Sequence, residues 1–277
     1  VLEAITQKAG MIIYVFAISL GLLIFIGKVS IESYSMSLSY YILLPTIIYL
    51  RLYFETYRVK YLFLSALSVL LIIAIGSRGP IMCLGVYIIF YYLINMKKAT
   101  YKRLIFHIAA LLIAFILFIF YKDILLFVYN ILENHGIQSR SIILFLEGGI
   151  YLSGREEIYA SIMEQIILNP LFGVGIAGDR VYLNGSYSHN IFLEIISGFG
   201  VIIGTLIILL LGLLIVKSLF SKNSKAANYV LIWFSVGFVP LIVSGSYLID
   251  FKFWIFLGVA LKSLGLPKIN NIYRQNT

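Results

Sequence analysis

The sequence predicts an all-α protein: a polytopic membrane helix bundle with about eight spans and one large extracytoplasmic loop that carries short helices. The first observation is composition, since hydrophobic residues make up 61% of the 277 residues and charged residues only 12%. Water-soluble domains are usually about half apolar or less, so this chain fits a bilayer better than water. Apolar runs that cross a bilayer do so as helices, because a helix satisfies its own backbone hydrogen bonds.

The second observation is a series of eight apolar runs. Most are close to the ~20 residues that a crossing helix needs, although the third and the last are short. The runs lie at about 10–27, 34–50, 61–76, 79–96, 104–121, 190–216, 229–249 and 251–266. They divide the chain into five spans in residues 1–121, a large extracytoplasmic loop in 122–188, and three spans with a cytoplasmic tail in 189–277.

The third observation is the distribution of positive charge. Lys and Arg follow spans two, four, six and eight, which places them all on one side if the spans alternate. They are Arg51, Arg58, Lys60, Lys97, Lys98, Lys102, Arg103, Lys217, Lys222, Lys225, Lys268 and Arg274. Lys and Arg concentrate on the cytoplasmic face of membrane proteins, so these loops are predicted to lie inside. The net charge of +9 is then mainly a topology signal, with anionic lipid head groups rather than nucleic acid as its partners.

The long loop at 122–188 consequently lies outside, and it holds seven of the twelve acidic residues. A loop of this length is usually functional or disordered, and its many aromatic and branched residues argue against disorder. The lone cysteine, Cys83, sits in an apolar run and excludes a disulfide framework or a thiolate metal cluster. The chain shows no internal repeat, which argues against an inverted-repeat transporter.

A helix is predicted to begin in this loop at a capping box, Ser153 to Glu156, and to stop at Pro170. Arg155 then lies in the first turn, where a cation is mildly unfavourable for the helix itself. Free backbone N–H groups beside a guanidinium suit a bound phosphate. The alternative is an exposed arginine that pairs with Glu156 or Glu157.

A glycine-rich segment follows, and Gly173 to Gly178 matches the pattern G-x-G-x-x-G. A dinucleotide site of this pattern follows a strand, whereas this segment follows a helix and a proline. The pattern therefore indicates a turn that needs positive φ, which glycine adopts at little cost. Such a turn also allows close approach of the backbone to a ligand.

His189 and Asn190 open the sixth span. The dipole of the helix that follows disfavours the imidazolium form, so His189 is expected to be neutral and able to accept a proton. The alternative is that both residues only cap the helix.

Two further charged residues, Arg78 and Glu194, lie at or near membrane depth, and Arg180 lies in the outer loop. Arg78 lies between spans three and four, Arg180 follows the glycine turn, and Glu194 lies in the first part of span six. Charged groups at such positions are often functional in membrane proteins. For Arg78 the alternative is an interfacial turn residue whose side chain reaches toward water.

Taken in order, four groups of residues resemble the signature of the O-antigen polymerase and O-antigen ligase family of bacterial membrane glycosyltransferases. The resemblance covers about residues 70–205. Its motifs are Ser77-Arg78-Gly79, Ser153-Gly154-Arg155, Asn169-Pro170 with Gly173-Val174-Gly175, and His189-Asn190 with Gly198-Phe199-Gly200. Members of this family usually have more than eight spans, and the chain begins at Val1 without a methionine, so spans are expected to be missing before residue 1.

The resemblance implies a metal-independent glycosyltransferase with no cofactor, which acts on undecaprenyl-pyrophosphate-linked sugars at the outer face of the bacterial cytoplasmic (inner) membrane. By resemblance, Arg78 and Arg155 hold the pyrophosphate and His189 helps to deprotonate the acceptor hydroxyl. We expect three residues to support this site: Arg180, Asn190 and Glu194.

Nothing in the sequence separates polymerase from ligase, and we expect a polymerase of surface polysaccharide, either O-antigen or capsule, because it is the broader class across cell envelopes. Its expected partners are the lipid-linked oligosaccharide, the bilayer, a chain-length regulator and a flippase. An O-antigen ligase that transfers the glycan to a lipid A core, a transporter of the same lipid-linked sugar, and a scaffold without catalysis remain open alternatives.

Overall fold

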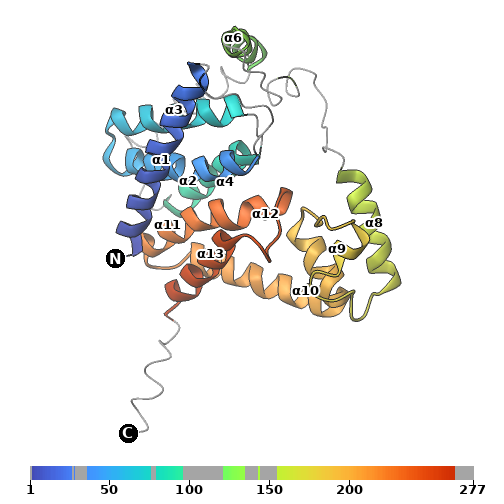
Figure 1. Cartoon of the computed structure of the whole chain (residues 1–277). Coiled ribbons are helices and arrows are strands. Elements are labelled where there is room, and N and C mark those ends of the chain that lie inside the picture. The colour runs from blue at the N-terminus through green and yellow to red at the C-terminus, as the bar shows by residue number, and fades with distance from the viewer. Residues whose placement is uncertain are drawn as a thin grey trace. The chain divides into compact units, whose positions relative to one another are not determined.

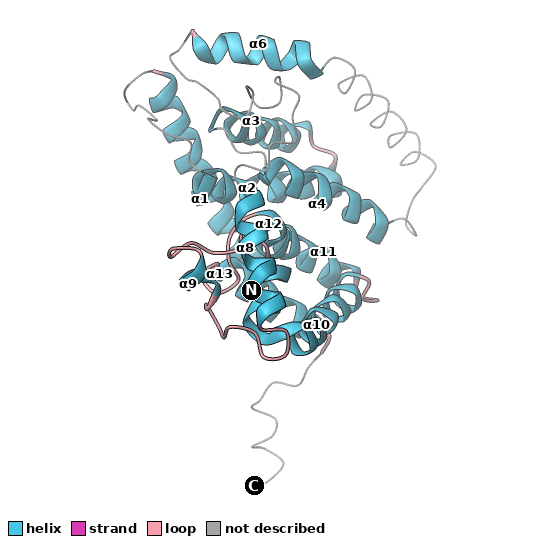
Figure 2. Ribbon diagram, turned by 90° about the vertical axis from the view of Figure 1, so that its right-hand side faces the viewer, coloured by secondary structure: helices cyan, strands magenta, loops and turns pink. Residues whose placement is uncertain are grey.

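A computed structural model describes residues 2–26, 28, 36–75, 79–95, 121–134, 143 and 155–265. Every regular element within these residues is helical (Figure 2), which confirms the predicted all-α class. The chain forms two compact units, Val1–Tyr151 and Leu152–Thr277, and each is described by itself (Figure 1).

The first unit is built around α2, which packs against α1, α3 and α4. A small buried cluster of Ala17, Ile42, Ile72 and Ile75 joins α1, α2 and α3. The elements of this unit are α1 (Leu2–Phe25), α2 (Met36–Thr56), α3 (Val59–Ile75), α4 (Gly79–Asn95) and α6 (Tyr121–Glu133).

Arg51, one of the residues that predict the topology, is buried near the end of α2. Its guanidinium pairs with Glu3 at 2.5 Å and with Glu55 at 2.7 Å. Because a buried charge is costly without a partner, the two carboxylates explain how an arginine is tolerated at this depth.

The second unit is built around the long helix α10. Helices α8, α11 and α13 all pack against it. The elements of this unit are α8 (Arg155–Leu168), α9 (Asp179–Tyr182), α10 (Ile191–Leu219), α11 (Ser224–Trp233), the π-helical turn η2 (Phe234–Phe238), α12 (Val239–Val243) and α13 (Phe251–Ser263). Helix α8 begins at Arg155 and ends just before Pro170, close to the predicted start and stop.

Helix α10 is broken at Gly200, whose φ of 76° and ψ of 171° are not helical. The break frees the carbonyl oxygens of Ser197 and Gly198, which would otherwise accept from N–H groups one turn later. The N–H groups of Val174 and Gly175 donate to these two carbonyls at 2.8 and 3.1 Å. The glycine-rich segment therefore closes the break in α10 by backbone hydrogen bonds.

Glycine is required at this contact because two backbones meet without side chains between them. Gly173 has a φ of 67°, and a Cβ atom there would lie 2.4 Å from the carbonyl oxygen of Ser197. The predicted positive-φ turn is thus confirmed. Within the second unit its closest approach is to the backbone of α10.

Among the described residues, four helical stretches are long and apolar enough to cross a membrane: Glu3–Leu23, Ser37–Thr56, Ile191–Leu219 and Ser224–Val243. Two shorter apolar helices, α3 and α4, coincide with the predicted third and fourth spans. Helix α13 occupies most of the predicted last span, and the predicted fifth span lies outside the described residues. Helices α6, α8 and α9 fall within or at the edge of residues 122–188.

Candidate functional site

Arg155 is the first residue of α8 and its side chain is half-buried. Its Nη1 donates a hydrogen bond to the carbonyl oxygen of Val243, the last residue of α12. The final carbonyls of a helix lack intrahelical partners and carry partial negative charge, so they suit a guanidinium. Among the described residues Arg155 forms no ion pair with Glu156 or Glu157. The alternative interpretation of an exposed arginine paired with its neighbours is therefore wrong.

Asn190 caps α10 and also reaches the end of α12. Its Oδ1 accepts from the N–H groups of Phe192 and Leu193 at 2.9 and 3.2 Å, and its Nδ2 donates to the carbonyl of Ile242 at 3.2 Å. Asn190 and Arg155 thus bind consecutive carbonyls at the end of α12. This shared anchor brings the starts of α8 and α10 together.

His189 lies directly before this cap, with a φ of 56° that a non-glycine residue adopts only rarely. The ring of Tyr187 lies against the imidazole, with 4.3 Å between the ring centroids. The imidazole Nδ1 is buried and has no hydrogen-bond partner among the described residues. The capping interpretation therefore holds for Asn190, while the His189 side chain makes no cap bond.

Burial lowers the pKa of His189 below its ordinary value, and the positive charge of Arg155 lowers that pKa further. The imidazole is therefore neutral near neutral pH, as the sequence predicts. In the structure, burial and a neighbouring cation lower the pKa of His189, whereas the sequence argument relied on the helix dipole.

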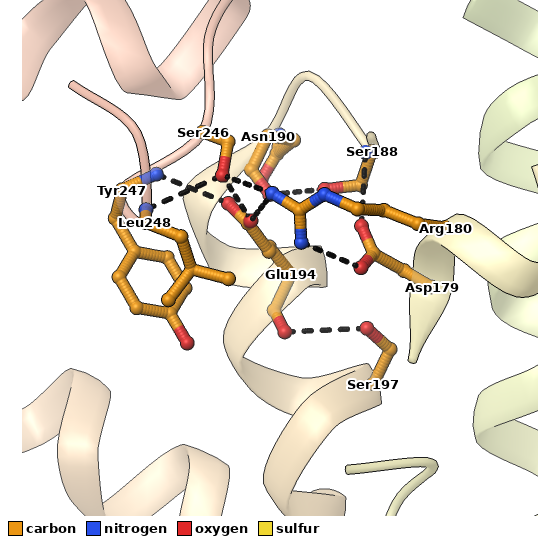
Figure 3. A network of polar contacts seen from close by, with 9 residues as sticks. All are labelled: Asp179, Arg180, Ser188, Asn190, Glu194, Ser197, Ser246, Tyr247 and Leu248. Carbon is orange, nitrogen blue, oxygen red and sulfur yellow. Dashed lines mark hydrogen bonds and ion pairs between the residues drawn. The ribbon is translucent and has the colours of Figure 1, made fainter. Parts of the chain in front are cut away.

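Glu194 lies one turn into α10 (Figure 3). Its side chain is buried, with only 3% of the residue exposed. Its carboxylate accepts a hydrogen bond from the hydroxyl of Ser246 and another from the backbone N–H of Tyr247 at 3.2 Å. Arg180 approaches the same carboxylate, with 3.6 Å between its Nη2 and Oε1, and donates to the Ser246 Oγ at 3.0 Å. Glu194 therefore ties α10 to the turn that follows α12.

Asp179, at the start of α9, is the second carboxylate of this network and is 2% exposed. Its Oδ1 lies 3.6 Å from the Nη1 of Arg180, and its Oδ2 accepts from the N–H of Ser188 at 3.2 Å (Figure 3). One guanidinium thus faces two buried carboxylates, and the three side chains join α9, α10 and the turn after α12. Asp179, Ser188 and Ser246 carry no motif or periodicity that would have singled them out from the sequence.

Two of the expected motifs cannot be placed. Arg78, Ser153 and Gly154 lie outside the described residues, so neither the second arginine nor the capping box is observed. Within the described residues, no three His, Cys, Asp or Glu side chains come together in a way that could hold a metal ion.

The chain has no match among the curated proteins or among the solved structures. A family model described as O-antigen ligase matches residues 63–209, which is more than half of the chain. The matched range includes the glycine turn, Arg155, His189, Glu194 and the break in α10. The chain therefore belongs to the O-antigen ligase family, whose members are membrane enzymes that transfer lipid-linked glycans.

Proposed function

We propose that this protein is a polymerase of a surface polysaccharide, O-antigen or capsule. It transfers a growing glycan from undecaprenyl pyrophosphate to a lipid-linked repeat unit at the outer face of the cytoplasmic membrane. The observation that carries the proposal is the pairing of Arg155 with His189. Among the described residues, the half-buried guanidinium of Arg155 has no carboxylate partner, and its charge acts on the neutral His189, whose Nδ1 has no hydrogen-bond partner there.

His189 acts as the general base in this reaction. The acceptor hydroxyl gives its proton to the imidazole, and its oxygen forms a bond to the anomeric carbon of the donor glycan. The bond between that carbon and the pyrophosphate oxygen breaks, and undecaprenyl pyrophosphate leaves with the electron pair. Because pyrophosphate is a good leaving group, the enzyme mainly has to position the reactants and remove the proton, without a metal or a cofactor.

Arg155 binds the pyrophosphate. A guanidinium has five N–H donors, and within the part of the chain that the structure describes Arg155 uses only Nη1, on the carbonyl of Val243. The remaining donors can form a bidentate contact with phosphate oxygens, which lysine cannot reproduce. By resemblance to the family, Arg78 is the second arginine that holds this group.

Arg180, Asn190 and Glu194 act as positioning residues. The charge of Arg180 is offset by Asp179 and Glu194, so its role is to hold α9 and the turn after α12 against α10. Asn190 holds the end of α12 directly. Together they keep the carbonyl that anchors Arg155 beside the start of α10.

The direct test is an assay of the purified protein with a lipid-linked repeat unit. We expect longer glycan chains and released undecaprenyl pyrophosphate, with and without EDTA. A parallel reaction with a lipid A core as acceptor tests the ligase alternative, and a vesicle assay tests transport of the intact lipid-linked sugar. Product on the lipid A core alone, or transport without a new glycosidic bond, would overturn the polymerase proposal. Activity that EDTA abolishes would overturn metal independence.

The extracytoplasmic location of the site is tested by labelling single cysteines in intact cells. Cysteines at Asn134 and Asn184 should react with a membrane-impermeant thiol reagent, because both positions belong to the predicted outer loop. A cysteine at Asn223, in the loop after α10, should not react. Labelling of Asn223 from outside would reverse the orientation and place the site on the cytoplasmic side.

A further inference from the structure

The end of α8 and the connection from α8 to α9 expose a set of large apolar side chains. Phe172 is 81% exposed and Ile176 is 64% exposed. No charged residue occurs from Gln165 to Gly178. Apolar side chains gathered in this way usually mark contact with a membrane or a protein. We call this set the apolar loop surface, and it consists of Ile167, Leu168, Leu171, Phe172 and Ile176.

Backbone contacts hold the apolar loop surface against α10 at Gly200 and Val201. The N–H of Val201 donates to the carbonyl of Pro170 at 2.7 Å. A Cβ atom on Gly200 would lie 2.2 Å from the carbonyl oxygen of Leu171, so the two backbones touch. The loop therefore sits beside the break in α10 and cannot move along the helix without losing these bonds.

The surroundings of α10 change at this break. Before Gly200 the helix is largely buried by its own unit, at Ile191, Glu194, Ile195 and Ser197 among others. After Gly200 it presents apolar side chains outward, beginning with Val201 and Ile202. The exposed apolar residues farther along are Ile203, Leu206, Leu209, Leu210, Leu213 and Val216.

The length of the second part of α10 matches a bilayer. Residues 201–219 span about 28 Å at about 1.5 Å per residue, close to the ~30 Å of a hydrocarbon core. Lys217 lies in the last turn, at the end predicted to face the cytoplasm. Placing residues 201–219 across the hydrocarbon puts its outer limit at Gly200 rather than at residue 190, the predicted start of the sixth span, and puts the apolar loop surface at the same level.

We propose that the apolar loop surface inserts into the leaflet at the N-terminal end of α10, the outer leaflet in the predicted orientation, and that its occupant is the acyl chains of bilayer lipids. The exposed apolar face of α10 starts at Val201, which is bonded to Pro170, so the loop extends a lipid-facing surface without interruption. Closing the break by backbone bonds fits this location, since unsatisfied backbone groups are costly at membrane depth. The proposal rests on this geometry and is independent of the reaction proposed above.

The test uses spin labels on the full chain in lipid nanodiscs, in a Cys83→Ala background. Labels are placed at Phe172→Cys, at Ile176→Cys and, as the matched control, at Asn184→Cys. Asn184 is an exposed polar position of the same loop, just after α9. We expect collisions with dissolved oxygen to exceed collisions with a water-soluble nickel chelate severalfold at 172 and 176, and the order to reverse at 184.

Reaction with a water-soluble maleimide provides a second readout that does not depend on the label. The cysteines at 172 and 176 should react at least tenfold more slowly than the one at 184 in nanodiscs, and all three equally in SDS. Nickel access at 172 equal to that at 184 would show that water covers the loop and would overturn the proposal. Low access to both oxygen and nickel would show that another part of the protein covers it, and would overturn the proposal as well.

Discussion

Two arginines of the second unit lie partly buried, but their charges are handled differently. Arg180 faces the carboxylates of Asp179 and Glu194, each at 3.6 Å. Arg155 has no carboxylate partner among the described residues and donates only to the carbonyl of Val243. A helix end offers at most about half an elementary charge, so the charge of Arg155 is left largely uncompensated.

The different partners of the two arginines suggest different roles: a paired charge holds the structure together, whereas an unpaired charge can bind a ligand. A buried charge without compensation is costly, and proteins usually pair it as they do Arg180. A guanidinium left with unused donors beside a neutral histidine can instead accept an anion that arrives with the substrate. We therefore propose that the Arg155 end binds pyrophosphate and that the Arg180 network holds the surrounding elements in place.

The change with the largest expected effect is His189→Ala, because it removes the proposed general base. It tests whether the Arg155 end of the site takes part in catalysis. Loss of a general base typically lowers turnover by about 10²–10⁴-fold. We expect this loss with retained binding of the lipid-linked substrate, measured as steady-state turnover and as direct binding. His135→Ala, a histidine of the same predicted loop, is the control and should leave turnover unchanged. An unchanged rate in His189→Ala would make His189 a structural residue.

Arg155→Ala is expected to lower the rate by roughly tenfold to a hundredfold, since a hydrogen bond to a charged group contributes about 1.5–3 kcal/mol. Arg155→Lys keeps the charge but loses the planar fork, so its rate should fall between wild type and alanine. The measurement is polymer length in cells and initial rate in vitro, at matched protein levels. Polymer of full length in cells carrying alanine at both Arg155 and Arg78 would contradict pyrophosphate binding by these arginines.

Arg180→Met should act mainly on stability. It leaves the carboxylates of Asp179 and Glu194 without their cation, which we expect to cost about 2–3 kcal/mol, less than for a fully buried pair because Arg180 is partly exposed. Adding Glu194→Gln should restore part of this loss, so the double variant is less destabilised than the sum of the singles. Thermal unfolding in detergent measures the stability of the two single variants and of the double variant. The activity per folded molecule of Arg180→Met should fall less than that of Arg155→Ala. Additive effects would show that the network is not a coupled unit.

The smallest expected effect is a shift in pH dependence. The base must be neutral, so the wild-type rate should fall as the pH drops through the pKa of His189. The charge of Arg155 lowers that pKa, so Arg155→Gln should raise it and move the acid limb of the rate profile to higher pH. Arg155→Lys keeps the charge and should leave the limb in place. A limb that stays fixed in Arg155→Gln would mean that the two groups do not interact.

Many features of this protein follow from local sequence. Apolar run length predicts the helices because the bilayer selects continuous hydrophobic stretches, and α1 to α4, α10 and α13 lie where those runs lie. Helix α8 ends before Pro170 because proline has no N–H group to continue the helix. Helix α10 begins after Asn190 because the asparagine side chain accepts hydrogen bonds from the first N–H groups of the helix. The positive φ of Gly173 follows in the same way, and the ordered motifs were enough to indicate the family.

Other features were decided only by tertiary packing. The partner of Arg155 is a carbonyl 88 residues away, and Ser246 lies 66 residues from Arg180. The glycine turn meets α10 at a break that hydropathy does not reveal, since Gly200 lies inside an uninterrupted apolar run. Hydropathy and capping depend on neighbours within a few residues, whereas the compensation of a buried charge depends on which chain segments pack together. The sequence alone therefore identifies both arginines as candidates. Only the fold shows that Arg180 faces two carboxylates, whereas Arg155 faces none among the described residues.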